Sequence, residues 1–156
     1  MIHISKILFP TDFSDFSEVA LKYALQFATD YKATLHVTHV VDNAYQFSMG
    51  AYPGMIPSIM PMVDAMVKEA EKGVQRLAAE RIGQSVKTVT KVLVGRPFEE
   101  IINYATSQAI DLIVIGTHGR GGLSHMLLGS VAEKVVRTAQ CPVLTVHHPE
   151  HEFVQP

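Results

Sequence analysis

Hydrophobic residues along the chain alternate between short continuous runs and longer stretches with a spacing of three to four positions. Short runs of branched residues are typical of buried strands, and the spaced stretches are typical of helices with one buried face. The runs predict strands at residues 4–10, 33–41, 86–94, 111–115 and 142–146. The stretches between them predict helices that begin near Ser14, Ser58, Pro97 and Ser130. This alternation predicts an α/β fold with a doubly wound parallel sheet.

The predicted helix ends carry residues that commonly start and stop helices. Thr11, Asp12 and Ser14 offer oxygen atoms that could cap the first helix. Pro61 falls in the first turn of the helix from Ser58, where proline is tolerated, and Gly83 is the expected C-cap of that helix.

The segment from Asp42 to Pro57 interrupts the regular pattern. It combines glycine and proline with tyrosine, phenylalanine and methionine, and it is long for a connection in a compact domain. Such a composition suits a lid over a bound base or a contact with a partner. The alternative is a poorly ordered insertion, and the sequence favours neither interpretation over the other.

Composition narrows the class of protein. The 156 residues are 47% hydrophobic and 18% charged, which favours one domain whose sheet is covered on both faces, or a sizeable oligomer interface. A net charge of -2 gives no electrostatic reason to expect a nucleic-acid or membrane partner. The single cysteine, Cys141, excludes a disulfide within the chain. With no leader peptide or membrane span recognised, we expect a cytoplasmic protein.

The richest chemical signal is the glycine-rich stretch 116–130, between a predicted strand and a predicted helix. Glycines let the backbone approach a phosphate closely, and the N–H groups that begin a helix attract anions. The alternative is an ordinary flexible loop. A Walker motif does not fit because Gly122 stands where its lysine is needed, and the dinucleotide fingerprint does not fit because Ser124 replaces its third glycine.

The spacing that does fit is Gly-x-x-Gly, nine residues, then Gly-Ser, formed by Gly116, Gly119, Gly129 and Ser130. It resembles the nucleotide signature of the universal stress protein family, in its ATP-binding branch. The resemblance extends to the stretches 7–14, 94–97 and 141–146. It implies an adenine nucleotide alpha hydrolase-like, Rossmann-like sheet of five parallel strands in the order 3-2-1-4-5, with helices on both faces. The implied domain spans residues 1–147, followed by a polar tail at 148–156.

The resemblance also implies a site for ATP. The aspartate of the opening motif would contact the ribose, the end of the second strand would line the adenine pocket, and the glycine signature would hold the phosphates. The implied ATP-binding residues are Pro10, Thr11, Asp12, Val40, Val41, Ile115, Gly116, Gly119, Arg120, Gly129, Ser130 and Val131. Carboxylates suit ribose hydroxyls and apolar residues suit a base. Mg²⁺ usually accompanies ATP, and the sequence leaves open whether it bridges the phosphates.

Several candidates have a simpler interpretation beside the functional one. Asp12 has the spacing of a helix cap, and Arg120 either neutralises phosphate charge or is solvated. His118 and His125 lie in the glycine stretch, where a position behind the phosphate-contacting residues or facing solvent is the simpler alternative to phosphate contact or acid–base chemistry. The histidines of residues 147–152 resemble a ligand cluster but have no closing partner at ligand spacing, so we predict no metal site.

Three classes of function follow from these residues together with the family resemblance, which implies the stress-response role and the homodimer. The first is an ATP-binding stress-response regulatory protein, a homodimer through the edge strand Pro142 to Val146 with at most slow hydrolysis. The second is a weak ATPase or a nucleotide- or phosphate-transfer enzyme, although no catalytic residue stands out. The third is a dimer without nucleotide. A flavin-binding electron carrier is disfavoured because the turn at residues 10–14 has no glycine.

Overall fold

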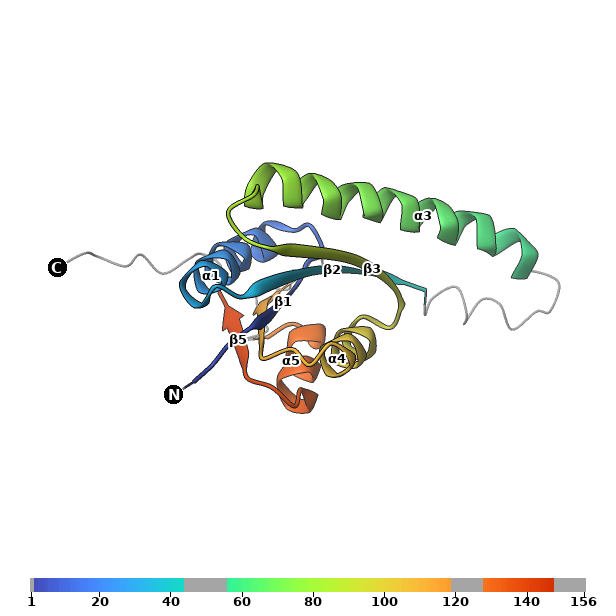
Figure 1. Cartoon of the computed structure of the whole chain (residues 1–156). Coiled ribbons are helices and arrows are strands. Elements are labelled where there is room, and N and C mark those ends of the chain that lie inside the picture. The colour runs from blue at the N-terminus through green and yellow to red at the C-terminus, as the bar shows by residue number, and fades with distance from the viewer. Residues whose placement is uncertain (1, 44–55, 119–127, 148–156) are drawn as a thin grey trace.

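The computed structural model describes residues 2–43, 56–118 and 128–147. Its core is one sheet of five parallel strands in the order β3-β2-β1-β4-β5 (Figure 1). The strands are β1 (Lys6–Pro10), β2 (Thr34–Asp42), β3 (Thr88–Gly95), β4 (Leu112–Gly116) and β5 (Val143–Val146). The predicted fold class is confirmed, and so is the strand order that the family resemblance implied.

Helices cover both faces of this sheet, as Figure 1 shows. The helical elements are α1 (Asp15–Tyr31), α3 (Ile56–Leu77), a π-helical turn η1 (Ala78–Ile82), α4 (Pro97–Ser107) and α5 (Ser130–Thr138). One face carries α1 and α3, and the other carries α4 and α5. Each strand–helix–strand connection places its helix over one face, which is how a parallel sheet becomes buried on both sides.

The central strands owe their position to continuous apolar runs. Ile7, Leu8 and Phe9 of β1 are each 0% exposed. Because successive side chains of a strand point to opposite faces, Ile7 and Phe9 pack under α1 while Leu8 packs against α4 and α5. Ile113 and Val114 of β4 divide between the two faces in the same way. A strand with polar residues at alternate positions would not fit this central place.

The structure confirms one helix start and corrects another. Ser14, one of the three candidate caps, is the N-cap of α1, since its side chain accepts the Ser17 N–H. Helix α3 begins at Ile56, so Pro61 lies inside the helix and not in its first turn. The predicted cap at the end of this helix is confirmed with one addition. Gly83, at φ 65°, follows the π-helical turn and donates its N–H to the Ala78 carbonyl.

Two predicted segments fall largely outside the described residues. These are positions 44–55 of the proposed lid and the tail at 148–156. Among the helices that are described, none combines the length and apolar character needed to cross a bilayer.

Candidate functional site

The predicted site lies where the strand order of the sheet reverses, between β1 and β4. Strands β1 and β4 pair in parallel, with Ile7 opposite Leu112 and Leu8 opposite Ile113. Their carboxyl ends therefore reach the same edge of the sheet, and the chain leaves them toward helices on opposite faces, which is where open α/β sheets commonly bind ligands. Ring contact confirms that the two ends meet, because Phe16 of α1 lies 5.5 Å from His118 between ring centroids.

Thr11, the first residue after β1, has its polar groups engaged within the protein. Its backbone N–H donates to the Thr38 carbonyl at 2.8 Å, and its hydroxyl oxygen accepts the Phe13 N–H at 3.0 Å. The Ser17 hydroxyl donates its one hydrogen to the Ser14 carbonyl, so the contact of 2.9 Å between the Thr11 and Ser17 oxygens uses the hydrogen of Thr11. Thr11 thus holds the corner together, and its side chain is buried.

Asp12 follows directly and is only partly buried. One carboxylate oxygen, Oδ1, accepts the backbone N–H of Ser14 at 3.1 Å and also the Ser14 hydroxyl. These bonds form an Asx turn, which fixes the direction of the carboxylate relative to the start of α1. Because Ser14 takes the capping role, the helix-cap interpretation of Asp12 does not account for this residue.

The glycines at either end of the signature are required by the fold itself. A Cβ atom at Gly116 would lie 2.8 Å from the carbonyl oxygen of Phe16, in the first turn of α1. A Cβ atom at Gly129 would lie 3.0 Å from the Thr117 carbonyl oxygen, which also accepts the Gly129 N–H at 2.6 Å. These glycines bring α1, the end of β4 and the start of α5 into backbone contact.

Helix α5 starts without a capping side chain. Its N-cap is Gly129, with φ -68° and ψ 154°, and no hydrogen bond from a described side chain caps the helix. Ser130 is exposed at the first helical position and Val131 follows it, partly buried. The N–H groups of this first turn have no partner within the helix, so they are suited to bind an anion. Gly119 and Arg120 lie outside the described residues.

The apolar residues that the strands contribute to the predicted site lie on different faces of the sheet. Val40 packs, partly buried, beside the cluster under α4 and α5, and Ile115 belongs to that cluster. Val41, the next residue in β2, is 3% exposed and points to the opposite face. Pro10 is buried at the end of β1. Of the two valines proposed to line an adenine pocket, Val40 is therefore the more accessible.

Sequence reasoning missed the aromatic residues beside this corner. Phe13 stacks on His39 with 4.6 Å between ring centroids, and His39 Nδ1 lies 2.8 Å from the Thr11 carbonyl oxygen. Phe16 supplies the backbone contact with Gly116. The one available signal for His39 was a polar residue inside an apolar strand. His118 Nδ1 lies 3.1 Å from the hydroxyl of the fully buried Thr117.

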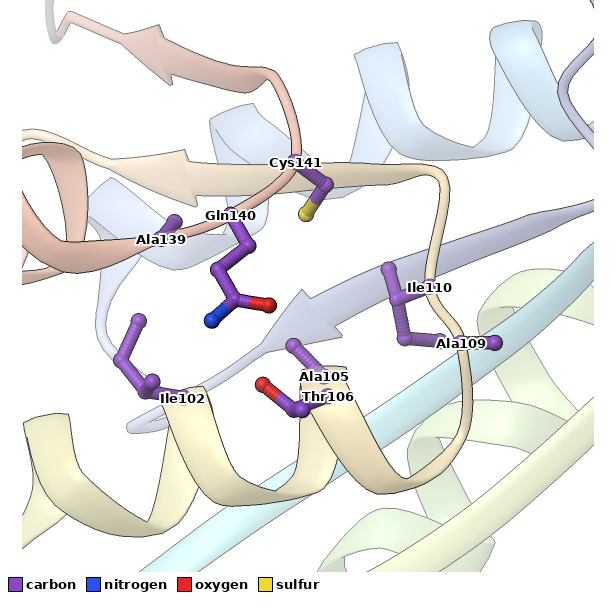
Figure 2. A pocket seen from close by; sticks show the side chains of 8 residues that line it. All are labelled: Ile102, Ala105, Thr106, Ala109, Ile110, Ala139, Gln140 and Cys141. Carbon is purple, nitrogen blue, oxygen red and sulfur yellow. The ribbon is translucent and has the colours of Figure 1, made fainter.

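The side chains that are described contain no group of three histidine, cysteine or carboxylate residues placed to hold a metal. A cavity of about 270 Å³ does occur elsewhere, between the ends of α4 and α5 (Figure 2). Its lining residues are Ile102, Ala105, Thr106, Ala109, Ile110, Ala139, Gln140 and Cys141. This cavity lies at the amino ends of β4 and β5, at the edge of the sheet opposite the predicted site, and its lining includes none of the predicted site residues. Cys141 is half-buried there, and this burial raises the pKa of its thiol.

Comparison with known proteins places this geometry in a family. The model of the universal stress protein family matches residues 3–147. Universal stress protein MJ0531 of Methanocaldococcus jannaschii is 40% identical over 147 residues, which cover 94% of this chain and 84% of the relative. The solved structure of MJ0577 superposes with a TM-score of 0.82 at 30% identity, covering 96% of this chain and all of that one.

A universal stress protein solved in complex with cAMP is also similar, with a TM-score of 0.59 and 26% identity over 93% of this chain and 98% of that chain. These matches span nearly the whole sheet with its helices and include both ends of the glycine signature. The chain therefore belongs to the universal stress protein family.

Proposed function

We propose that this protein is an ATP-binding regulatory module of the stress response. One observation supports the proposal: the Asp12 turn follows β1 and the start of α5 follows β4, so both lie at the same edge of the sheet beside the point where the strand order reverses, and no described side chain caps α5. A carboxylate can bind sugar hydroxyls, and bare N–H groups at a helix start can bind phosphate. The complex of a similar family member with cAMP supports an adenine nucleotide as the ligand class.

The proposed roles follow the position of each residue. Asp12 would bind the ribose, and Val40 would contact the adenine from the carboxyl end of β2. The first-turn N–H groups of α5 and the hydroxyl of Ser130 would bind the phosphates. Gly119 and Arg120 keep their predicted phosphate roles. Mg²⁺ would be held through the phosphates of the nucleotide, and we assign it no protein ligand.

We further propose that hydrolysis is slow at most. Efficient phosphoryl transfer needs a group that orients water and a cation that neutralises the transition state. In the described part of α5, Arg137 is paired with Glu133 at 3.0 Å and lies in the last turn of the helix, away from the helix start. A weak ATPase therefore remains the second candidate function, and ADP formation is its test.

The edge of the sheet suggests how two copies would associate. Strand β5 ends the strand order, and the Pro142 and Val146 carbonyls accept N–H groups from the β4 side. Because alternate residues of a parallel strand face opposite neighbours, the N–H and carbonyl groups of Val143 and Thr145 point away from β4. We propose that these groups pair with the same strand of a second copy across a two-fold axis.

Nucleotide binding is tested by denaturing freshly purified protein, identifying released nucleotide by chromatography, and titrating stripped protein with ATP by calorimetry. Asp12→Asn should weaken ATP binding by about tenfold or more, since it removes a charged hydrogen-bond acceptor while preserving an oxygen for the Asx turn. Ser130→Ala should also weaken it.

Asp15→Asn is the matched control, because Asp15 is exposed in the first turn of α1 and makes the same change of charge. It should bind like the wild type. A wild type that releases no nucleotide and does not bind added ATP would refute the proposed function. Steady ADP release at the rate of a dedicated ATPase would replace it with the enzyme.

A further inference from the structure

Phe13 adopts a backbone conformation that aromatic residues rarely use. Its φ is 61°, in the left-handed region, where a bulky side chain is strained. Such strain persists only where surrounding contacts hold it, and it is common in binding sites. Phe13 directly follows Asp12, so whatever holds Phe13 also fixes the direction of the Asp12 backbone.

Two contacts hold the Phe13 ring. On one side it stacks on His39 of β2, with 4.6 Å between ring centroids and 26° between the ring planes. The tip of the ring lies against Gly73 of α3, so closely that a Cβ atom at Gly73 would lie 2.8 Å from it. The ring therefore contacts both a strand and a helix, and a side chain at position 73 would displace it.

His39 also holds the residue on the other side of Asp12. Its Nδ1 lies 2.8 Å from the Thr11 carbonyl oxygen, and a carbonyl only accepts, so Nδ1 carries the hydrogen and donates it. One imidazole thus binds the backbone of Thr11 and the ring of Phe13 together. Asp12 lies between these two residues and has its own carboxylate fixed by Ser14.

We propose that His39, Phe13 and Gly73 are positioning residues that aim the Asp12 carboxylate at the ribose, and that α3 thereby sets nucleotide affinity. This inference rests on the proposed nucleotide function. A movement of α3 at Gly73 would displace the Phe13 ring and, through it, the Asp12 turn. In this way α3 is connected to the Asp12 turn through a single aromatic side chain, that of Phe13.

If His39, Phe13 and Gly73 contributed to packing alone, changing them would not alter the preference for one sugar over another. The quantity to measure is therefore the ratio of the affinities for ATP and 2′-deoxy-ATP. ATP and 2′-deoxy-ATP differ only by the hydroxyl that Asp12 would bind. We expect the wild type to bind ATP about tenfold more tightly, since a hydrogen bond to a charged group contributes that much. Gly73→Ala should reduce this ratio toward one, as Asp12→Asn should.

The stability of Gly73→Ala is measured by thermal unfolding without nucleotide. Alanine favours helix over glycine, which offsets the cost of displacing the ring, so folding should be retained. Lys72→Ala is the control on the same helix, because the Lys72 side chain is exposed and should leave the ratio unchanged. His39→Phe preserves an aromatic ring but removes the donor to Thr11, and it should also lower the ratio.

A double variant tests whether the effect passes through the ring. In the Phe13→Leu background the ring tip is absent, so adding Gly73→Ala should change the ratio no further. Retention of the full ratio in Gly73→Ala would overturn the inference while leaving nucleotide binding intact. Equal affinity of the wild type for ATP and 2′-deoxy-ATP would also overturn it, whereas absence of any ATP binding would refute the proposed function itself.

Discussion

Gly116→Ala is the sharpest test of why the signature contains glycine. The added Cβ would lie 2.8 Å from the Phe16 carbonyl oxygen and 3.1 Å from its carbon, whereas ordinary contacts begin at 3.4 Å. The neighbour is backbone in the first turn of α1, so it cannot rotate away as a side chain would. Helix α1 or the end of β4 must shift by about 0.6 Å, the difference between 3.4 and 2.8 Å.

The magnitude follows from two opposing terms. Overpacking a well-packed interior costs about 1–3 kcal/mol, and the reduced freedom of the unfolded chain returns about 0.4–1 kcal/mol. The expected net loss in the free energy of unfolding is therefore about 1–2 kcal/mol. For a chain of this size each kcal/mol changes Tm by about 2–4 °C, so the midpoint should fall by about 2–8 °C.

The assay is thermal unfolding of nucleotide-free protein, followed by circular dichroism. Ser130→Ala is the control within the same signature, because Ser130 is exposed and its loss should change stability by less than about 0.5 kcal/mol. A Gly116→Ala protein that melts like the wild type would refute the argument that the fold requires this glycine. If the argument holds, loss of ATP binding in glycine variants does not by itself locate the phosphates.

Three further predictions concern other parts of the fold. Asp111→Ala removes the acceptor of hydrogen bonds of 2.7 to 2.9 Å at the start of β1, and urea unfolding should show a loss of about 1–2 kcal/mol. Burial would raise the pKa of Asp111, but these bonds outweigh it and hold the pKa below 3.8, so the wild type should lose this stabilisation only as pH falls through that lowered pKa. Burial, and then the charge of Lys6, lower the pKa of His36 below 6.5. The unfolded state therefore takes up that proton first, so stability should fall from pH 7 to pH 5, and less so in His36→Leu. Thr145→Pro removes an outward N–H of the β5 edge and should yield monomer in size-exclusion chromatography; an unchanged elution volume would contradict the proposed dimer.

The sequence predicted the elements well where a local pattern determines them. The apolar runs around Leu8 and Val114 are buried on both faces, and a strand of that composition fits few other places. The start of α3 was predicted at Ser58, two residues too late, because the helix already begins at Ile56. The order of the strands needed the family resemblance, since pairing joins residues far apart in the chain and leaves no mark on periodicity.

For the site, too, local motifs could be predicted from the sequence and long-range contacts could not. Gly116 and Ser130 could be named from motif spacing and Asp12 from the family resemblance, and the structure brings the turns that carry them to one edge of the sheet. The contacts of His39 and Gly73 with the Phe13 ring could not be predicted, because neither residue belongs to a local motif with Phe13. Its positive φ is also invisible in the sequence, since glycine and asparagine are the usual signals for that conformation.

The two helices that begin at this edge of the sheet differ in a way that would set the orientation of the proposed nucleotide. The start of α1 has a side-chain cap, because the Ser14 side chain accepts the Ser17 N–H, and the Asp12 carboxylate lies just before it. The start of α5 has a glycine cap that contributes no side chain. A phosphate group would therefore gain more at α5, where no described side chain caps the helix, than at α1, where the Ser17 N–H is already capped and the Asp12 carboxylate repels an anion. The same carboxylate favours neutral hydroxyls, so the proposed nucleotide would lie with its sugar on the α1 side and its phosphates on the α5 side.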